Sequence, residues 1–167
     1  CVAHNGNLVP VPGRDIMVQA WYQGGISVID FTDPANVFEI AYFDRGPLSA
    51  ETLLVGGYWS VYWHDGRIYG AEIARGVDVL ELLPSDHLSE VELAAAQRAL
   101  TPETANVQTQ TRITWEDHPD VARAYLVQLQ RSEALTGDLA DTIAEALDAW
   151  ANGRTPRARL ADQVSAA

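Results

Sequence analysis

The stretch that decides the fold is Trp21-Tyr22-Gln23-Gly24-Gly25-Ile26-Ser27-Val28-Ile29-Asp30-Phe31-Thr32-Asp33-Pro34. A weaker second copy follows at residues 72–84, EIARGVDVLELLP, shifted by 51 residues from Gly25 to Gly76. A β-rich repeat of about this length is typical of propeller blades and similar arrays. The other positions that match across the shift are Ile26 with Val77, Val28 with Val79, Ala20 with Ala71, Asp30 with Glu81 and Phe31 with Leu82.

Runs of β-branched and aromatic residues predict further strands around each copy. Asp65-Gly66 lies between two such runs and predicts a tight type I′ hairpin. Gly25 and Gly76 precede their strands directly, where a turn often requires positive φ. The first unit is predicted to have four antiparallel strands, at about 2–8, 15–21, 25–31 and 38–42, and the second unit three, at 58–63, 67–73 and 76–82.

Four strands is the size of a propeller blade, and the second unit lacks its fourth strand because a helix start replaces it. Propellers often complete the last blade with a strand from the other end of the chain. The sequence therefore predicts a mainly β fold with a helical C-terminal part, in which two blades form the C-terminal part of a longer propeller. The alternative is a self-contained two-sheet β domain with a helical tail.

The repeat resembles the LVIVD-repeat family, which consists of bacterial and archaeal cell-surface β-propellers. The residues that carry the resemblance are 25–34, 39–42 and, more weakly, 76–82, and the similarity covers residues 1–83. The resemblance implies a secreted or surface-exposed propeller, mostly of unknown biochemical role, whose partners are its remaining blades. It brings no catalytic motif to any position of this chain.

The net charge of −12 argues against two classes of partner. Nucleic acids and anionic membranes both require clustered cations, and the basic residues here are eleven scattered arginines.

The single cysteine, Cys1, excludes an internal disulfide framework. Cys1 would suit a lipid-anchored N-terminus, but the residues after it lead straight into a strand. No apolar run reaches the ~18 residues that a membrane span needs.

The C-terminal half has a helical pattern. Ser89 and Glu92 form a capping box, flanked by the hydrophobic staple of Leu88 and Leu93, for a helix that runs to about Leu100. Two further helices are predicted as an antiparallel hairpin, the first starting at Pro119 and the second ending at Asn152-Gly153. The hairpin either packs on the β part or docks a partner. The expected divisions are residues 1–83 for the blades, 84–116 for a helix and extended linker, and 117–167 for the hairpin and a frayed tail.

The candidate ligand-facing residues lie on the strands expected to line a propeller channel. His4 is the one candidate metal ligand, and it would need ligands from other blades because no histidine pair or Cys-x-x-Cys has suitable spacing. No Gly-x-Ser-x-Gly elbow is present, and no catalytic residue or cofactor is assigned. The full candidate set is His4, Asn5, Trp59, Ser60 and Tyr62.

These observations predict a non-catalytic binding or structural module at the cell surface, with a protein or a carbohydrate as its ligand. The alternative is part of an enzyme that holds a metal in the propeller channel through His4. The dense aromatic residues of the β part serve inter-blade packing or stack on a ligand.

Overall fold

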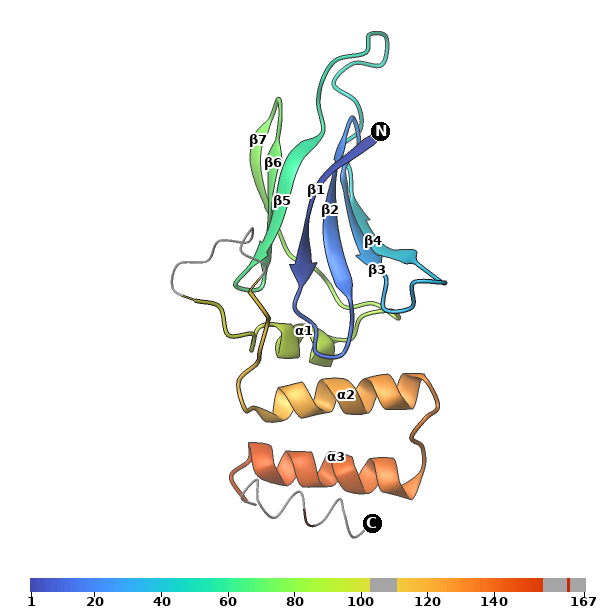
Figure 1. The fold of residues 1–167 in the computed structure, drawn as a ribbon, viewed down its shortest axis with the longest axis vertical. Coiled ribbons are helices and arrows are strands. Elements are labelled where there is room, and N and C mark those ends of the chain that lie inside the picture. Colours follow the sequence, from blue (N-terminus) through green and yellow to red (C-terminus); the bar gives the residue numbers. More distant parts are fainter. Residues whose placement is uncertain (103–110, 155–161, 163–167) are drawn as a thin grey trace.

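The computed structural model describes residues 1–102, 111–154 and 162. Two antiparallel sheets stand side by side, and three helices lie beyond one end of them (Figure 1). The first sheet has the order β1 (Val2–Val9), β2 (Ile16–Tyr22), β3 (Ile26–Asp30) and β4 (Phe38–Phe43). The second has the order β5 (Tyr58–His64), β6 (Arg67–Glu72) and β7 (Gly76–Leu80). The helices are α1 (Glu90–Ala96), α2 (Pro119–Arg131) and α3 (Asp138–Ala151).

The predicted mainly β fold with four and three antiparallel strands and a helical C-terminal part is confirmed, and each strand boundary agrees within two residues. Asp65 (φ 46°) and Gly66 (φ 73°) form the expected type I′ turn, and Gly76 has φ 95°. The reason expected for Gly25 was wrong, because positive φ occurs at Gln23 (φ 55°) instead. Gly25 is required because a Cβ there would lie 1.9 Å from the carbonyl oxygen of Phe43.

The main core lies between the two sheets. Side chains at alternate positions of β2 and β3 point toward the second sheet, as the paired register of the two strands requires. The second sheet contributes aromatic and aliphatic side chains from β5 and β6 to this core. The principal members of this core are Ile16, Val18, Ala20, Ile26, Val28, Tyr58, Val61, Trp63 and Ile68.

Equivalent faces of the two sheets do not meet each other. Ile26 and Val28 are 2% and 3% exposed, whereas their counterparts in the repeat, Val77 and Val79, are 70% and 59% exposed. The face that β3 buries is therefore the face that β7 leaves open. The sheets therefore pack head to tail, which means that one face of the first sheet meets the opposite face of the second, as in successive members of an array. In a two-fold pair, both sheets would bury the same face.

The first helix starts as predicted and ends early. The capping box between Ser89 and Glu92 is present, and Leu88 and Leu93 are both buried. The expected extension to Leu100 was wrong, because the Leu100 N–H donates to the carbonyl of Thr114 at 2.7 Å instead of continuing the helix. Residues 103–110 of the expected extended linker, and the tail after Arg154 except residue 162, lie outside the described residues.

The helical hairpin is held to the turn between β1 and β2. The Gln128 amide of α2 donates to the Pro12 carbonyl at 2.9 Å, and a Cβ on Gly13 would lie 2.6 Å from the Tyr125 ring. Helix α3 packs against α2 through a separate apolar cluster that includes Leu126 and Leu147. The α2 side of the hairpin thus covers the end of the β part (Figure 1).

Among the described residues, no helix combines the length and the apolar character that crossing a membrane requires.

A buried charge network joins these parts. The side chain of Glu92 is fully buried and accepts hydrogen bonds from Arg14 at 2.9 Å and from Arg131 at 2.5 Å. Arg14, from the β1–β2 turn, also pairs with Asp30 at the end of β3. Burial by itself raises the pKa of Glu92, but the hydrogen bonds from Arg131 and Ser89 outweigh it and lower the pKa to about 2. One carboxylate therefore links α1, α2 and the first sheet.

We expect Glu92→Gln to lower the free energy of unfolding by about 3 kcal/mol, because it breaks the ion pairs of Glu92 with Arg14 and Arg131, although Arg14 keeps its pair with Asp30. Because the folded-state pKa lies below the ordinary value of 4.5, the ionised carboxylate stabilises the fold above that value. This stabilisation is lost as the pH falls from about 5 to about 2, and Glu92→Gln should weaken this acid dependence.

Urea denaturation at a series of pH values measures both effects. Glu90→Gln is the matched control, because Glu90 lies in the same helical turn and is exposed. Equal stabilities and equal pH profiles for the two variants would show that the network does not join the helices to the sheet.

Candidate functional site

The five candidate residues lie on two strands that run side by side. His4 and Asn5 belong to β1, and Trp59, Ser60 and Tyr62 belong to β5. These strands are the neighbouring edges of the two sheets, and Figure 1 shows them next to each other. The structure thus brings together residues that are about 55 positions apart in the sequence.

Each of these strands contains a register shift at the candidate residues. In β1 the shift lies between Ala3 and Gly6, so that His4 and Asn5 stand opposite the single residue Ala20. In β5 the shift lies between Tyr58 and Ser60, and Trp59 is the extra residue. An inserted residue of this kind changes the direction of its side chain, and such bulges often occur beside functional sites.

Asn5 ties the two sheets together. Its Oδ1 accepts a hydrogen bond from the Val61 N–H at 2.8 Å, and two residues further along Asn7 Oδ1 accepts from the Trp63 N–H at 2.8 Å. The side chains of β1 thus satisfy backbone donors on the edge of β5. Sequence reasoning included Asn5 but missed Asn7, although two asparagines spaced for one face of a strand are visible in Asn5-Gly6-Asn7.

His4 and Trp59 meet in a cluster with Tyr22 of β2, which we term the aromatic corner. The His4 ring centroid lies 4.6 Å from that of Tyr22 and 5.5 Å from that of Trp59, and the Tyr22–Trp59 separation is 6.0 Å. The plane of the Trp59 ring makes an angle of 70° with the His4 ring and of 75° with the Tyr22 ring, so both contacts are edge-to-face. Sequence reasoning placed Tyr22 among the aromatic residues but not among the site residues.

The hydrogen bond of His4 fixes its tautomer. Its Nδ1 contacts the carbonyl oxygen of Trp59, and only a protonated Nδ1 can donate to a carbonyl. In the neutral ring, Nε2 therefore keeps its lone pair and can accept a hydrogen bond or bind a metal.

Ser60 and Tyr62 do not join the aromatic corner. They stand opposite Ala71 and Tyr69 on β6, on the face of the second sheet that turns away from the first. Both side chains are half-buried, and they belong to the open face that also carries Val77 and Val79.

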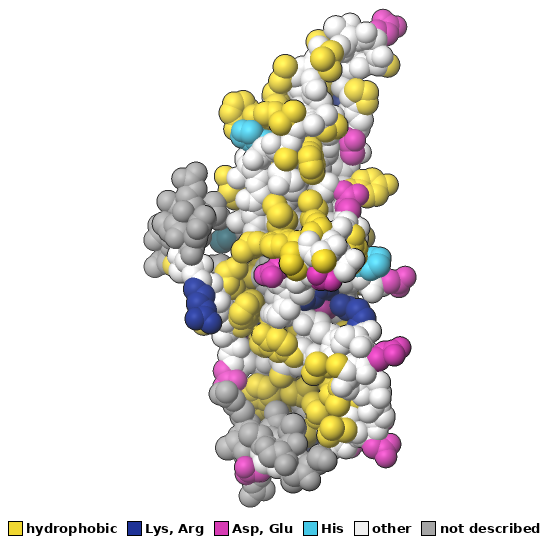
Figure 2. Space-filling view, turned by 45° about the vertical axis from the view of Figure 1, so that its right-hand side comes forward, with side chains coloured by type: hydrophobic (Ala, Val, Ile, Leu, Met, Phe, Trp, Pro, Cys, Tyr) yellow, Lys and Arg dark blue, Asp and Glu magenta, His cyan; other side chains and the backbone are white. Residues whose placement is uncertain are grey.

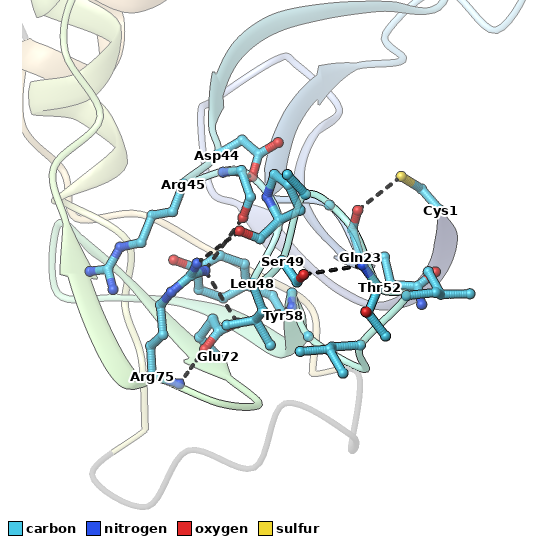
Figure 3. Close-up of a pocket in the computed structure, with 18 of the residues that line it drawn as sticks. Cys1, Gln23, Asp44, Arg45, Leu48, Ser49, Thr52, Tyr58, Glu72 and Arg75 are labelled. Carbon is cyan, nitrogen blue, oxygen red and sulfur yellow. Dashed lines mark hydrogen bonds and ion pairs between the residues drawn. The ribbon is translucent and has the colours of Figure 1, made fainter.

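A cleft of about 470 Å³ opens at the same end of the molecule, beneath the loop that joins β4 to β5 (Figure 3). The Glu72 carboxylate lies on its wall and accepts from the N–H groups of Gly57 at 3.0 Å and Ala74 at 2.9 Å. Tyr58 donates to Asp78 at 2.5 Å, and burial together with that carboxylate raises the pKa of Tyr58 above its ordinary value. Glu72 thus joins the end of the β4–β5 loop to the β6–β7 turn, and the Tyr58–Asp78 hydrogen bond joins β5 to β7.

No group of three or more His, Cys, Asp and Glu side chains in the described part of the chain is placed to hold a metal ion. The chain has no significant match among protein-family models, curated proteins or solved structures. The LVIVD resemblance therefore stays a prediction.

We expect Asn7→Ala to lower the free energy of unfolding by about 1–3 kcal/mol, because it leaves the buried Trp63 N–H without its acceptor. Thermal denaturation followed by circular dichroism measures the loss. Asn36→Ala is the control, since Asn36 is exposed in the β3–β4 loop and its amide bonds only to Asp33. A loss no larger than that of Asn36→Ala would mean that the asparagines do not tie the sheets together.

Proposed function

We propose that residues 1–83 are two neighbouring blades of a larger β-propeller, which serves as a non-catalytic binding or structural module at the cell surface. The observation that carries the proposal is the head-to-tail packing, in which Val28 is buried and its repeat counterpart Val79 is exposed. An interface between unlike faces leaves one unlike face open at each end of a pair, so further members can be added, and they form a ring where the rotation between members closes. The resemblance to the LVIVD-repeat family supports the surface location.

Both outer faces have the apolar character that further blades would cover. On the second sheet, Val77, Val79 and Tyr69 are exposed, and on the first sheet Tyr42 is 76% and Leu8 48% exposed. A self-contained sheet pair normally turns polar side chains to water, in alternation with its core. Figure 2 shows hydrophobic side chains along much of the visible face, and such exposed apolar surfaces mark interaction sites.

The edge of the second sheet supports the same proposal. Strand β7 is the last strand of a three-stranded sheet, and no described strand pairs with its outer edge. A strand from another part of a longer chain would complete the fourth position of the blade and satisfy that edge. The partners of this segment are then the remaining blades of the same protein.

Chemical labelling of the natural full-length product tests the proposal. In a Cys1→Ser background, the Val79→Cys variant should react with a maleimide about as slowly as Val28→Cys, whose site is buried between the two sheets. Leu53→Cys, at a site that is 83% exposed in the β4–β5 loop, is the fast reference.

Labelling in urea shows that all three thiols react equally once the protein is unfolded. If Val79→Cys reacts as fast as Leu53→Cys in the native full-length protein, no further blade covers this face and the propeller proposal is wrong. The same conclusion follows if the natural product is a monomer of only these 167 residues.

The second candidate is an enzyme with a metal in its channel, and the tautomer of His4 favours it. A metal-binding histidine commonly donates its other ring N–H to a carbonyl, as His4 does to Trp59. The further ligands would come from residues outside those described. Under this candidate the purified full-length protein contains stoichiometric metal that His4→Ala removes, and a metal-free, folded protein would contradict it.

A further inference from the structure

We propose that the aromatic corner of His4, Tyr22 and Trp59 binds an uncharged sugar ring, which stacks on the indole of Trp59. The inference deepens the proposed binding role by naming the class of ligand. It relies on that role, but it does not require the propeller ring to close, because all three rings come from the described strands β1, β2 and β5.

The first argument is the open ring of Trp59. This side chain is 57% exposed, although it contacts both His4 and Tyr22. An indole covered on both faces would expose little more than its edge, so one face of Trp59 is open to solvent. A large exposed aromatic face can stack on the apolar C–H face of a pyranose, and tryptophan offers the largest such face.

The second argument is that the corner is held in place. The two register shifts direct His4 and Trp59 toward each other, and His4 is fixed by its hydrogen bond to the Trp59 carbonyl. Asn5 binds the Val61 N–H beside them at 2.8 Å. A ring held by its neighbours loses little side-chain entropy when a ligand binds, which favours recognition.

The third argument is the uncharged composition of the strands that carry the corner. Residues 1–13, 16–29 and 52–63 contain no Asp, Glu, Lys or Arg, although 20% of the whole chain is charged. A phosphate or a uronic acid would need arginines here, because charge-assisted hydrogen bonds from guanidinium groups are the usual means of binding such anions. Most side chains of these strands are apolar or aromatic, and an uncharged ligand suits such a surface.

His4 completes the recognition. Because its Nδ1 donates to the Trp59 carbonyl, Nε2 is available to accept a hydrogen bond from a sugar hydroxyl. The three rings and the Nε2 acceptor together suit an uncharged sugar.

The test is a titration of the natural full-length protein with uncharged hexasaccharides of glucose, mannose, xylose and N-acetylglucosamine. Tryptophan fluorescence and calorimetry report binding. We expect at least one of these sugars to bind with a dissociation constant of about 1 mM or lower. Trp59→Ala should weaken it by about tenfold or more, and Trp59→Phe, which keeps a ring, should weaken it less.

Tyr125→Ala is the matched control, because Tyr125 is an aromatic residue that is 45% exposed on α2, away from the corner. It should leave the affinity unchanged, whereas His4→Ala should reduce it several-fold. Circular dichroism of each variant confirms that it is folded. Oligogalacturonate serves as the acidic probe and should bind more weakly than the neutral sugars.

The proposal is overturned if no neutral hexasaccharide binds, if the acidic probe binds more tightly, or if Trp59→Ala binds as well as the unchanged protein. The sugar titration and the labelling experiment fail independently. Slow labelling of Val79→Cys without sugar binding would reject the sugar site and leave the propeller proposal standing. Sugar binding with fast labelling of Val79→Cys would reject the propeller and leave the sugar site standing.

Discussion

A β-sheet with two apolar faces must have both covered, and this constraint governs the β part of the protein. Val18, Ile26 and Val28 of the first sheet are covered by the opposite face of the second. The second sheet therefore presents Val77 and Val79 outward, and the same packing cannot satisfy them within this pair. The open faces and the propeller proposal both follow from this mismatch.

The helical part depends on a different interaction. Glu92 caps α1 and, from the same carboxylate, binds Arg14 of the first sheet and Arg131 of α2. A buried carboxylate remains ionised only with such partners, so the three parts are bound to one another by charge and geometry. The helices consequently lie beyond one end of the sheets, and the loop between β4 and β5 extends from the other end (Figure 1). That loop lines the cleft.

The neighbouring edge strands β1 and β5 carry both the contacts that join the sheets and residues of the aromatic corner. Asn5 and Asn7 use their side chains to satisfy the edge of β5, which brings the two bulged segments together. This approach places His4 against Trp59 without any charged residue in the strands that form the corner. The features that join the sheets thus also shape the surface available to a ligand.

The sequence alone determined the local structure. Alternating apolar residues defined the strands, Asp65-Gly66 defined the hairpin, and Ser89 with Glu92 defined the start of a helix, because each of these signals acts over a few neighbouring residues. The repeat also determined which side chains of the two units are equivalent.

Only the tertiary structure decided which of those equivalent side chains are buried, because burial depends on the order in which sheets stack. It decided that Glu92 is a buried link as well as a cap, and that Leu100 pairs with Thr114 instead of extending α1. It also decided that Trp59 joins His4 while Ser60 does not. A bulge changes the direction of a side chain by the insertion of a single residue, and the contact between His4 and Trp59 joins strands some 55 residues apart, beyond the reach of local sequence signals.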